Sequence, residues 1–438
     1  MRLIVLSLAM LTACRAPVTP TPTLEPGATA APATATLSAS AATASPPAPT
    51  AAASPTPAGP REMTICLTAE PRSLYRYARP EAGRAHILAA LTDGPIDVTH
   101  YSDQPVLIER LPSLDNGGIA LRQVDVVPGE MVLDVLDRAR PLANGMTLRL
   151  AEGSETTYSG TLPIQLPQLT VTFHLRPDLR WSDGAPLTAG DSMFAYELGR
   201  SPDSFDPLAQ AAAGTARYSA PNDQTVVWTG LPGNLDPRAG ANFWPPLPRH
   251  QFAELSASDI ADTIEASRTL LSYGPFAVRE WTPGQQLVVE RNPFYWRAGE
   301  GLPRLDRITY RFVADASTLM NDLRAGDCDL APSGAAPADS PAAADGLVHY
   351  SVAGDSLLHL DFDLAPAGDY TGTARSGLWQ DAGLRQALAY CLDRPALGGG
   401  QAPPAAFLPR EHPHYAADAV EYPFNAQHGR QLLGARGW

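Results

Sequence analysis

Apolar and polar residues alternate most regularly over residues 168–175, which read QLTVTFHL. Leu169, Val171, Phe173 and Leu175 occupy every second position there, so they share one face of an extended chain. A period of two is typical of a strand with one face against a core. The pattern therefore predicts a half-buried strand at this point of the chain.

Further short apolar runs, bounded by glycine, proline or aspartate, predict more strands. They are EMTICL (62–67), TVVWTG (225–230), LDRITYRFV (305–313), CDLA (328–331) and SLLHLDFDL (356–364). Other segments have helical spacing, and in one of them Asp315 and Gly326 are suited to cap the two ends of the helix. They cover residues 85–91, 315–326 and 381–394. Since strands and helices are interspersed, we expect an α/β protein.

The stretch LRPDLRWSDGAPLTAGD, residues 175–191, follows the first strand and is rich in aspartate. A reactive carboxylate site is one interpretation. However, Asp178 and Asp183 stand in sequences typical of turns. Thr188 and Asp191 have the spacing of a helix capping box, and the Asp191 charge also suits the helix dipole. We therefore expect these side chains to have structural roles.

The first fourteen residues resemble a bacterial lipoprotein signal. A basic start and an apolar run too short to span a membrane lead to LTAC, residues 11–14. This reading predicts cleavage before Cys14 and its lipidation, which would anchor the chain to the outer, periplasmic-side face of the cell membrane. An ordinary secretory signal with a chance cysteine is the alternative. Both readings predict an extracytoplasmic protein.

Residues 15–60 contain eleven prolines and only two charged residues, Arg15 and Glu25. Such a segment buries too little apolar surface to offset the entropy of ordering it. We expect a disordered Pro/Ala/Thr linker that carries a globular part beyond the membrane.

Overall composition narrows the function classes. The chain has 438 residues with 44% hydrophobic content, which suits two or more lobes. A formal charge of −14 argues against nucleic acid as a partner, because phosphate binding needs a cationic surface.

The sequence contains no nucleophile elbow, phosphate loop or zinc motif. His412 and His414 are separated by a proline, which suits a shared metal poorly. A secreted hydrolase that uses an acid pair has no local support. We therefore expect no enzyme activity, no metal and no cofactor.

Beyond Cys14 the chain has three cysteines, Cys66, Cys328 and Cys391. A bond between Cys328 and Cys391 would close a loop of about sixty residues and contribute about 4 kcal/mol by loop entropy. Cys391 also lies on the apolar stripe of a predicted helix, where a buried free thiol is common. Spacing alone leaves both readings open.

Five segments in order resemble the family 5 extracellular solute-binding proteins, receptors of ABC importers for oligopeptides, dipeptides, nickel and related solutes. The segments are FHLRPDLRWSDGAPLTAGD, YGPFAVREWTPGQQLVVERNPFYW, LDRITYRFVADASTLMNDLRAGDCDL, LRQALAYCLDR and GRQLLGARGW. Two more, YSDQPVLIERLPSL and NFWPPLPRH, resemble a lipoprotein branch of the family. The resemblance implies a class II periplasmic-binding-protein fold, with a first lobe over 61–270, a second over 271–438 and a cleft between them.

The same resemblance implies an oligopeptide or other small solute as ligand and ABC permease subunits as partners. It also implies a Cys328–Cys391 disulfide, with Cys66 left as a buried free thiol. Candidate ligand-binding residues by position in the resemblance are Arg79, Pro80, Glu81, His359 and Asp361.

In the family, the segment that RQLLGARGW resembles is followed by a long further stretch, whereas the present sequence ends at Trp438. We therefore expect an incomplete second lobe. The alternative to an importer subunit is a truncated or non-transport extracytoplasmic binding or sensor protein with impaired ligand capture.

Overall fold

The computed structural model describes most of the chain from residue 59 onwards. The described residues are 59–99, 101–202, 204–206, 208–332, 346–348, 378–397 and 412–438, together with 360, 362, 364, 406 and 408. Contacts divide the chain at residues 350/351. We call the described residues before this point the body and those after it the helical unit. No helix in these ranges is long and apolar enough to cross a membrane.

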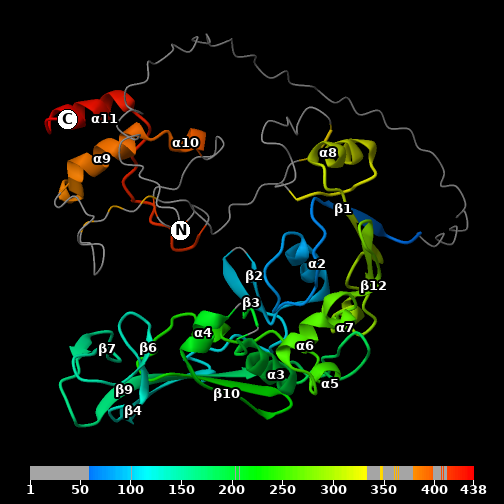
Figure 1. Cartoon of the computed structure of the whole chain (residues 1–438), viewed down its shortest axis with the longest axis horizontal. Coiled ribbons are helices and arrows are strands. Elements are labelled where there is room, and N and C mark those ends of the chain that lie inside the picture. The colour runs from blue at the N-terminus through cyan, green and yellow to red at the C-terminus, as the bar shows by residue number, and fades with distance from the viewer. Residues whose placement is uncertain are drawn as a thin grey trace, which may run out of the picture. The chain divides into compact units, whose positions relative to one another are not determined.

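The first of the two four-stranded sheets of the body is antiparallel, and its strand order is β10-β11-β9-β4. Its strands are β4 (Ile119–Val126), β9 (Ile164–His174), β10 (Thr215–Asn222) and β11 (Thr225–Gly230). Helix α3 (Ala189–Gly199) packs on β10 and β11, and Figure 1 shows it lying along this sheet. The alternation predicted over 168–175 is confirmed, because its four apolar side chains are all buried.

The second sheet has the order β1-β14-β13-β12 and joins residues that are far apart in sequence. Its strands are β1 (Glu62–Leu67), β12 (Phe276–Thr282), β13 (Gln286–Arg291) and β14 (Arg307–Phe312). β1 pairs with β14 in parallel, whereas the other pairs are antiparallel. Helix α2 (Arg84–Leu91) contacts β12 and buries Ile87 and Leu91 beside this sheet. In sequence, the boundary predicted between the two lobes, at residues 270/271, lies between β1 and β14. This one sheet therefore contains strands from both predicted lobes.

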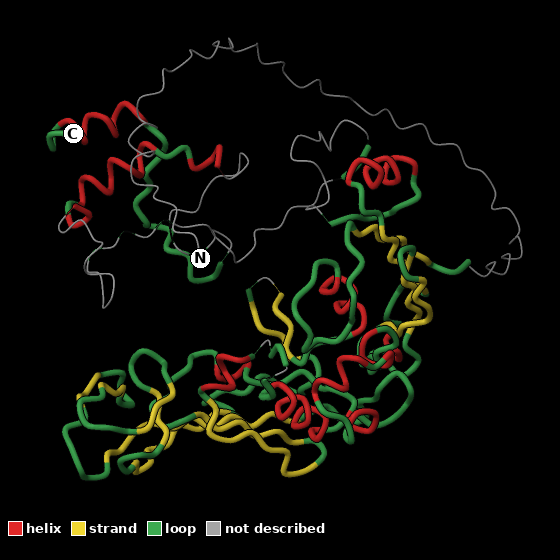
Figure 2. The backbone as a smooth tube through the Cα atoms, in the orientation of Figure 1, coloured by secondary structure: helices red, strands yellow, loops and turns green. Residues whose placement is uncertain are grey.

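Three small two-stranded sheets and several short helices complete the body (Figure 2). The strands are β2 (Ile96–Thr99), β3 (Ser102–Pro105), β5 (Met131–Leu133), β6 (Ala139–Pro141), β7 (Thr147–Arg149) and β8 (Glu155–Thr157). The helices are α4 (Ala209–Ala213), α5 (Arg249–Phe252), α6 (Ala257–Asp262), α7 (Ile264–Ser267) and α8 (Ala316–Ala325), with 3-10 turns at Ala239–Ala241 and Ala298–Glu300. Residues in or next to strands β4 to β9 form a separate small core, which consists of Val126, Val132, Leu142, Leu148, Tyr158 and Leu166.

The aspartate-rich stretch 175–191 is structural, as predicted. Thr188 and Asp191 form the capping box of α3, in which the Thr188 amide donates to the Asp191 carboxylate at 2.7 Å. Asp191 is 4% exposed and also accepts a 2.9 Å hydrogen bond from the Arg249 amide. Burial nevertheless raises the pKa of this carboxyl. The residue therefore joins α3 to α5.

The same stretch also helps to join the two sheets. The Ser182 amide donates to the Ser272 carbonyl at 2.7 Å, and the Ser272 amide donates back to Ser182 Oγ at 3.0 Å. Trp181 packs edge-on against Tyr273, with ring centroids 5.3 Å apart. The Asn292 side chain donates to the Gly274 carbonyl at 2.9 Å. Two of the family-like segments thus meet at one joint.

The helical unit contains α9 (Ala382–Cys391), α10 (Arg394–Leu397), α11 (Ala426–Gly434) and a 3-10 turn at Leu378–Gln380. α9 and α11 pack together around Leu384, Ala387, Cys391 and Leu433. Asp381 caps α9 by accepting hydrogen bonds from the amides of Gly383 and Leu384. The predicted helix over 381–394 is thereby confirmed. The strand predicted over 356–364 falls largely outside the described residues.

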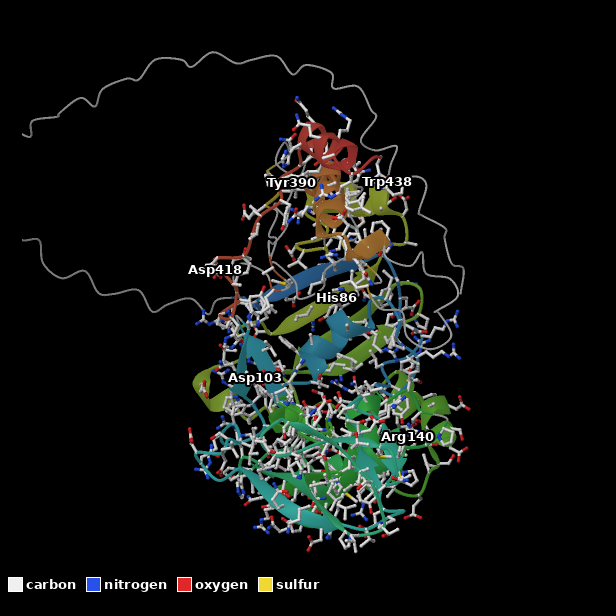
Figure 3. All side chains as sticks on the ribbon, turned by 90° about the vertical axis from the view of Figure 1, so that its left-hand side faces the viewer. His86, Asp103, Arg140, Tyr390, Asp418 and Trp438 are labelled. Carbon is white, nitrogen blue, oxygen red and sulfur yellow. A yellow bond between two sulfur atoms is a disulfide. The ribbon has the colours of Figure 1, made fainter. Side chains whose placement is uncertain are left out.

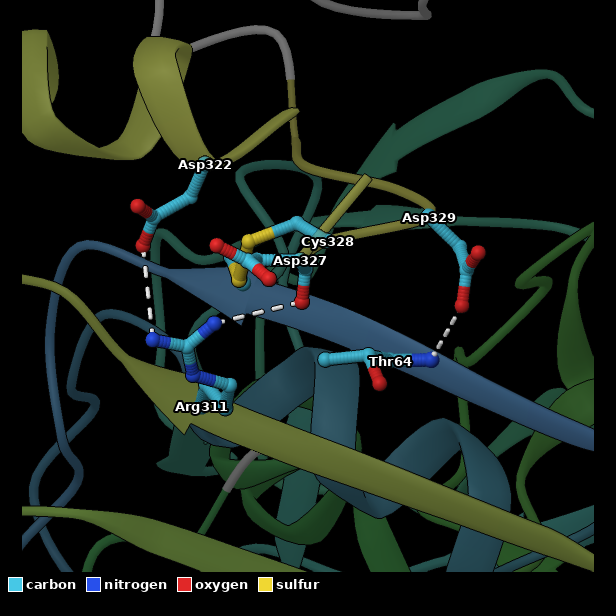
Figure 4. The surroundings of a disulfide bond; sticks show 7 residues. Thr64, Arg311, Asp322, Asp327, Cys328 and Asp329 are labelled. Carbon is cyan, nitrogen blue, oxygen red and sulfur yellow. Dashed lines mark hydrogen bonds and ion pairs between the residues drawn. A yellow bond between two sulfur atoms is a disulfide. The ribbon is translucent and has the colours of Figure 1, made fainter. Parts of the chain in front are cut away.

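The disulfide prediction is wrong. Cys328 is bonded to Cys66, with Cα atoms 5.8 Å apart, and not to Cys391 (Figure 4). Residues 328–330 run beside β1, where the Cys66 amide donates to the Leu330 carbonyl at 2.8 Å and the Thr64 amide to the Asp329 carboxylate at 2.7 Å. This added backbone pairing places the two sulfur atoms together. Cys66 is therefore not a free thiol.

Candidate ligand-binding site

The loop between β1 and α2 carries the three candidate residues that lie in the body. Arg79 and Pro80 are exposed, whereas Glu81 is half-buried. The Glu81 carboxylate accepts a 2.7 Å hydrogen bond from the Arg72 amide, which ties the two ends of the loop together. The structure thus places Arg79 and Pro80 at the surface, where a ligand can reach them.

A buried arginine holds this loop in shape. Arg84, at the start of α2, is only 4% exposed, and its guanidinium donates to the carbonyls of Tyr75 (2.6 Å), Ala78 (3.3 Å) and Arg79. Burial lowers the pKa of Arg84. Because three carbonyls share one rigid donor, the loop has a fixed backbone conformation.

Beside the loop lies a polar group that we call the acid–tyrosine cluster, comprising Arg76, Thr92, Asp93, Asp97, Tyr273 and Tyr295. Arg76 comes from the loop itself and donates to Thr92 Oγ1 at 3.0 Å. The Tyr295 hydroxyl donates to Asp93 Oδ2 at 2.5 Å. The cluster therefore joins the loop to the end of α2 and to the segment that follows β13.

The two carboxylates of the cluster influence each other. Desolvation, and then the neighbouring Asp93 carboxylate, raise the pKa of Asp97 above its ordinary value. Burial, followed by the hydrogen bond to Asp93, raises the pKa of Tyr295. Carboxylate and hydroxyl oxygens are hydrogen-bond acceptors, which is what an ammonium donor requires.

The arrangement suits binding more than catalysis. A nucleophile with an adjacent base is the usual sign of covalent chemistry, whereas the cluster pairs acids with tyrosines. Among the described residues, no group of three or more His, Cys, Asp or Glu side chains is placed to hold a metal ion. His412 and His414 lie with ring centroids 5.6 Å apart.

Several predicted site residues cannot be placed. His359, Asp361 and the lipidation candidate Cys14 lie outside the described residues. Conversely, sequence reasoning missed Asp93 and Asp97. The signal for them was the sequence DGPID, in which a Gly-Pro turn brings two flanking aspartates together.

Comparison with known proteins identifies the relatives of this chain. The family model described as bacterial extracellular solute-binding proteins, family 5 Middle, matches residues 164–438. An ABC transporter peptide-binding protein from Brucella ovis is 28% identical over 285 residues, which cover 62% of this chain and 50% of that protein. The oligopeptide-binding protein AppA from Bacillus subtilis is 26% identical, over 60% of this chain and 48% of its own. The chain thus spans about half the length of these curated relatives.

Solved structures agree on the fold. An oligopeptide-binding protein from Thermus thermophilus, solved with a pentapeptide, superposes with a TM-score of 0.52 at 18% identity. The match covers 87% of this chain and 64% of that one. The open, unliganded murein tripeptide-binding protein MppA gives a TM-score of 0.55 at 17% identity, over 87% and 67% of the two chains. The predicted periplasmic-binding-protein-like α/β fold is thereby confirmed.

Proposed function

Since the chain belongs to the family 5 bacterial extracellular solute-binding proteins, we propose that it is the solute-binding subunit of an ABC importer and that it binds oligopeptides. The observation that carries this proposal is the match to relatives named as peptide-binding proteins. As a binding protein, it would carry out no covalent chemistry.

The body supplies features that suit a peptide ligand. The Arg84-braced loop offers a rigid backbone next to the exposed Arg79 and Pro80. An extended peptide can pair with such a backbone while tolerating different side chains. The Asp93–Asp97 pair would then receive the ammonium group at the peptide N-terminus. Ligand contacts would shift the protein toward a closed state that an ABC permease recognises.

We further propose that Cys14 is lipidated and that residues 15–60 form the tether. At about 3.1 Å per residue, an extended proline-rich segment of this length reaches on the order of 140 Å. That reach would let the binding unit find the permease while it stays anchored to the outer face of the membrane.

Isothermal titration calorimetry on the full chain tests the ligand class. We expect heat of binding with pentapeptides that carry a free N-terminus, and weaker binding once that N-terminus is acetylated. Nickel and maltose serve as the alternative ligands. If no pentapeptide binds at millimolar concentration, importer function for peptides is rejected, and a non-transport binding or sensor role is favoured.

A further inference from the structure

A cavity of about 670 Å³ lies in the body, apart from the acid–tyrosine cluster. One wall comes from the small sheets β5–β6 and β7–β8, and the other from α4 and the loop 234–242. Ligand sites for small molecules typically occupy about 300–1,000 Å³. The size of this cavity therefore fits a small solute.

The first wall has a fixed shape. The buried Asp134 carboxylate accepts hydrogen bonds from Arg138 Nε (2.9 Å) and from the Leu136 amide (2.9 Å), and Arg140 of β6 (Figure 3) lies 3.8 Å from it. This network holds the turn in which Asp137 adopts a left-handed conformation with φ 55°. Arg149 then pairs with Asp137 at 3.1 Å. The wall thus presents one carboxylate and one guanidinium to the cavity.

The second wall is also built from side chains that bind the backbone. The buried Asn234 amide group donates to the Gly214 carbonyl at 3.1 Å, which fixes the loop to the end of α4. Asp236 accepts from the Arg238 amide at 2.8 Å and from Asn242 Nδ2 at 3.3 Å. This wall, too, carries one carboxylate and one guanidinium.

Some polar groups in the second wall have no partner among the described residues. Asn242 is 6% exposed, yet its Oδ1 accepts no hydrogen bond there. The Arg238 guanidinium and the Gln210 amide group also form no hydrogen bond or ion pair with the described residues. These three groups line the cavity and are available to a polar ligand.

The charges of the lining define the ligand. Asp137 and Asp236 balance Arg149 and Arg238, so the cavity favours a solute without net charge. The unpaired guanidinium fits a carboxylate, the aspartates fit an ammonium group, and Asn242 Oδ1 fits a peptide N–H. We propose that this cavity is a second binding site, which takes a zwitterionic peptide of two or three residues.

The proposal stands independently of the function proposed above. The cavity shares no lining residue with the acid–tyrosine cluster or with the loop that carries Arg79 and Pro80.

Calorimetry on the full chain with alanyl-alanine tests the proposal. We expect Arg238→Ala to weaken dipeptide binding by about tenfold, the loss typical of one charge-assisted hydrogen bond. Asn242→Ala should weaken it as well. The control is Arg217→Ala, an exposed arginine on β10 outside the cavity, which should leave the affinity unchanged. Because Arg238 is itself exposed, its replacement does not threaten folding.

Two further measurements identify the class of ligand and the location of its binding site. Alanyl-alanine blocked at both ends, and maltose, should bind at least tenfold more weakly than the zwitterion. A diazirine-bearing dipeptide should cross-link to residues 131–149 or 234–242, as mapped by mass spectrometry. The proposal is overturned by unchanged dipeptide affinity in Arg238→Ala, by cross-links elsewhere, or by no binding at millimolar concentration. Arg238→Ala should leave the affinity for pentapeptides unchanged. The proposal of a second site and the proposed importer function are therefore tested independently.

Discussion

Cys66 and Cys328 are joined across 262 residues of sequence, and the bond fastens the edge of the second sheet to the segment that follows α8. Cys66 is fully buried and Cys328 is 3% exposed. Around them, Arg311 pairs with Asp322 at 3.4 Å and donates to the Asp327 carbonyl at 3.2 Å (Figure 4). The disulfide therefore lies within a set of contacts that hold 322–330 on β1 and β14.

Removal of this bond should destabilise the body. A cross-link that closes so long a loop restricts the unfolded chain strongly, so the double variant Cys66→Ala/Cys328→Ala should lose about 2–5 kcal/mol of unfolding free energy. Urea denaturation followed by tryptophan fluorescence measures the loss. Dithiothreitol should lower the midpoint of the parent protein more than that of the double variant. Non-reducing peptide mapping that joins Cys328 to Cys391 would contradict the structure.

The Cys66–Cys328 disulfide shows which features could not be predicted from local sequence patterns. The local pattern of EMTICL was sufficient to predict a strand, and β1 begins and ends where predicted. The strand predicted for CDLA is wrong, because this segment forms only an isolated bridge, between Leu330 and Ile65. Local patterns do not show which strands lie side by side. In a parallel pair such as β1 and β14, a long connection separates the two strands in sequence. Neither spacing nor the family resemblance placed Cys66 beside Cys328.

Helix caps, by contrast, were predictable from sequence. Asp315 caps α8 by accepting from the Thr318 amide, and Gly326 ends the helix at φ 82°, both as expected. These features depend on residues within one turn of the chain. The acid–tyrosine cluster depends on α2, Tyr273 and Tyr295 coming together over some 200 residues, so local patterns could not reveal it.

Ser272 should be important for the joint between the two sheets. Its buried hydroxyl donates to the Leu91 carbonyl at 2.7 Å and accepts from the Gly274 amide at 3.2 Å. Ser272→Ala removes both of these hydrogen bonds, while the Gly274 amide still donates to the Leu91 carbonyl at 2.9 Å, so we expect a loss of about 1 kcal/mol in unfolding free energy. The exposed Ser102→Ala should change it by less than about 0.5 kcal/mol. Equal stabilities of the two variants would argue against a joint at Ser272.

Arg84 should stabilise the loop that carries the candidate ligand residues. Arg84→Ala removes the donor shared by three carbonyls, and we expect a loss of about 3 kcal/mol. Hydrogen exchange should then show faster exchange over residues 73–83. Arg72→Ala in the same loop is the matched control, because its side chain is 94% exposed and its loss should cost less than about 0.5 kcal/mol. Unaltered exchange in Arg84→Ala would show that the loop does not depend on this side chain.

The Asp97 carboxyl should set the pH dependence of peptide binding. Its pKa is raised, so its charge is lost at a higher pH than that of an ordinary aspartate, about 3.9. If the carboxylate binds the peptide ammonium group, affinity should fall as the pH drops through this raised value. Calorimetry with pentapeptides across the acidic range should show the fall in the parent protein. In Asp97→Asn, affinity should be lower at neutral pH and nearly flat with pH, and a parallel decline in both proteins would contradict the assignment.

Asp381 should make the helical unit sensitive to acid. Its carboxylate caps α9 and accepts from Arg436 Nε at 3.0 Å, and this hydrogen bond from Arg436 is the main cause that lowers the pKa of Asp381. A lowered pKa in the folded state contributes stability that is fully present above the unfolded value and is lost as the pH falls through the folded one. Hydrogen exchange of the α9 amides should therefore be slower in the parent protein than in Asp381→Asn at pH values above about 5. The two should converge in strong acid, where the parent carboxyl is protonated. Because the two proteins are compared at each pH, the intrinsic pH dependence of hydrogen exchange cancels. A difference between them that persists unchanged in strong acid would show that the charge of Asp381 does not hold α9 to α11.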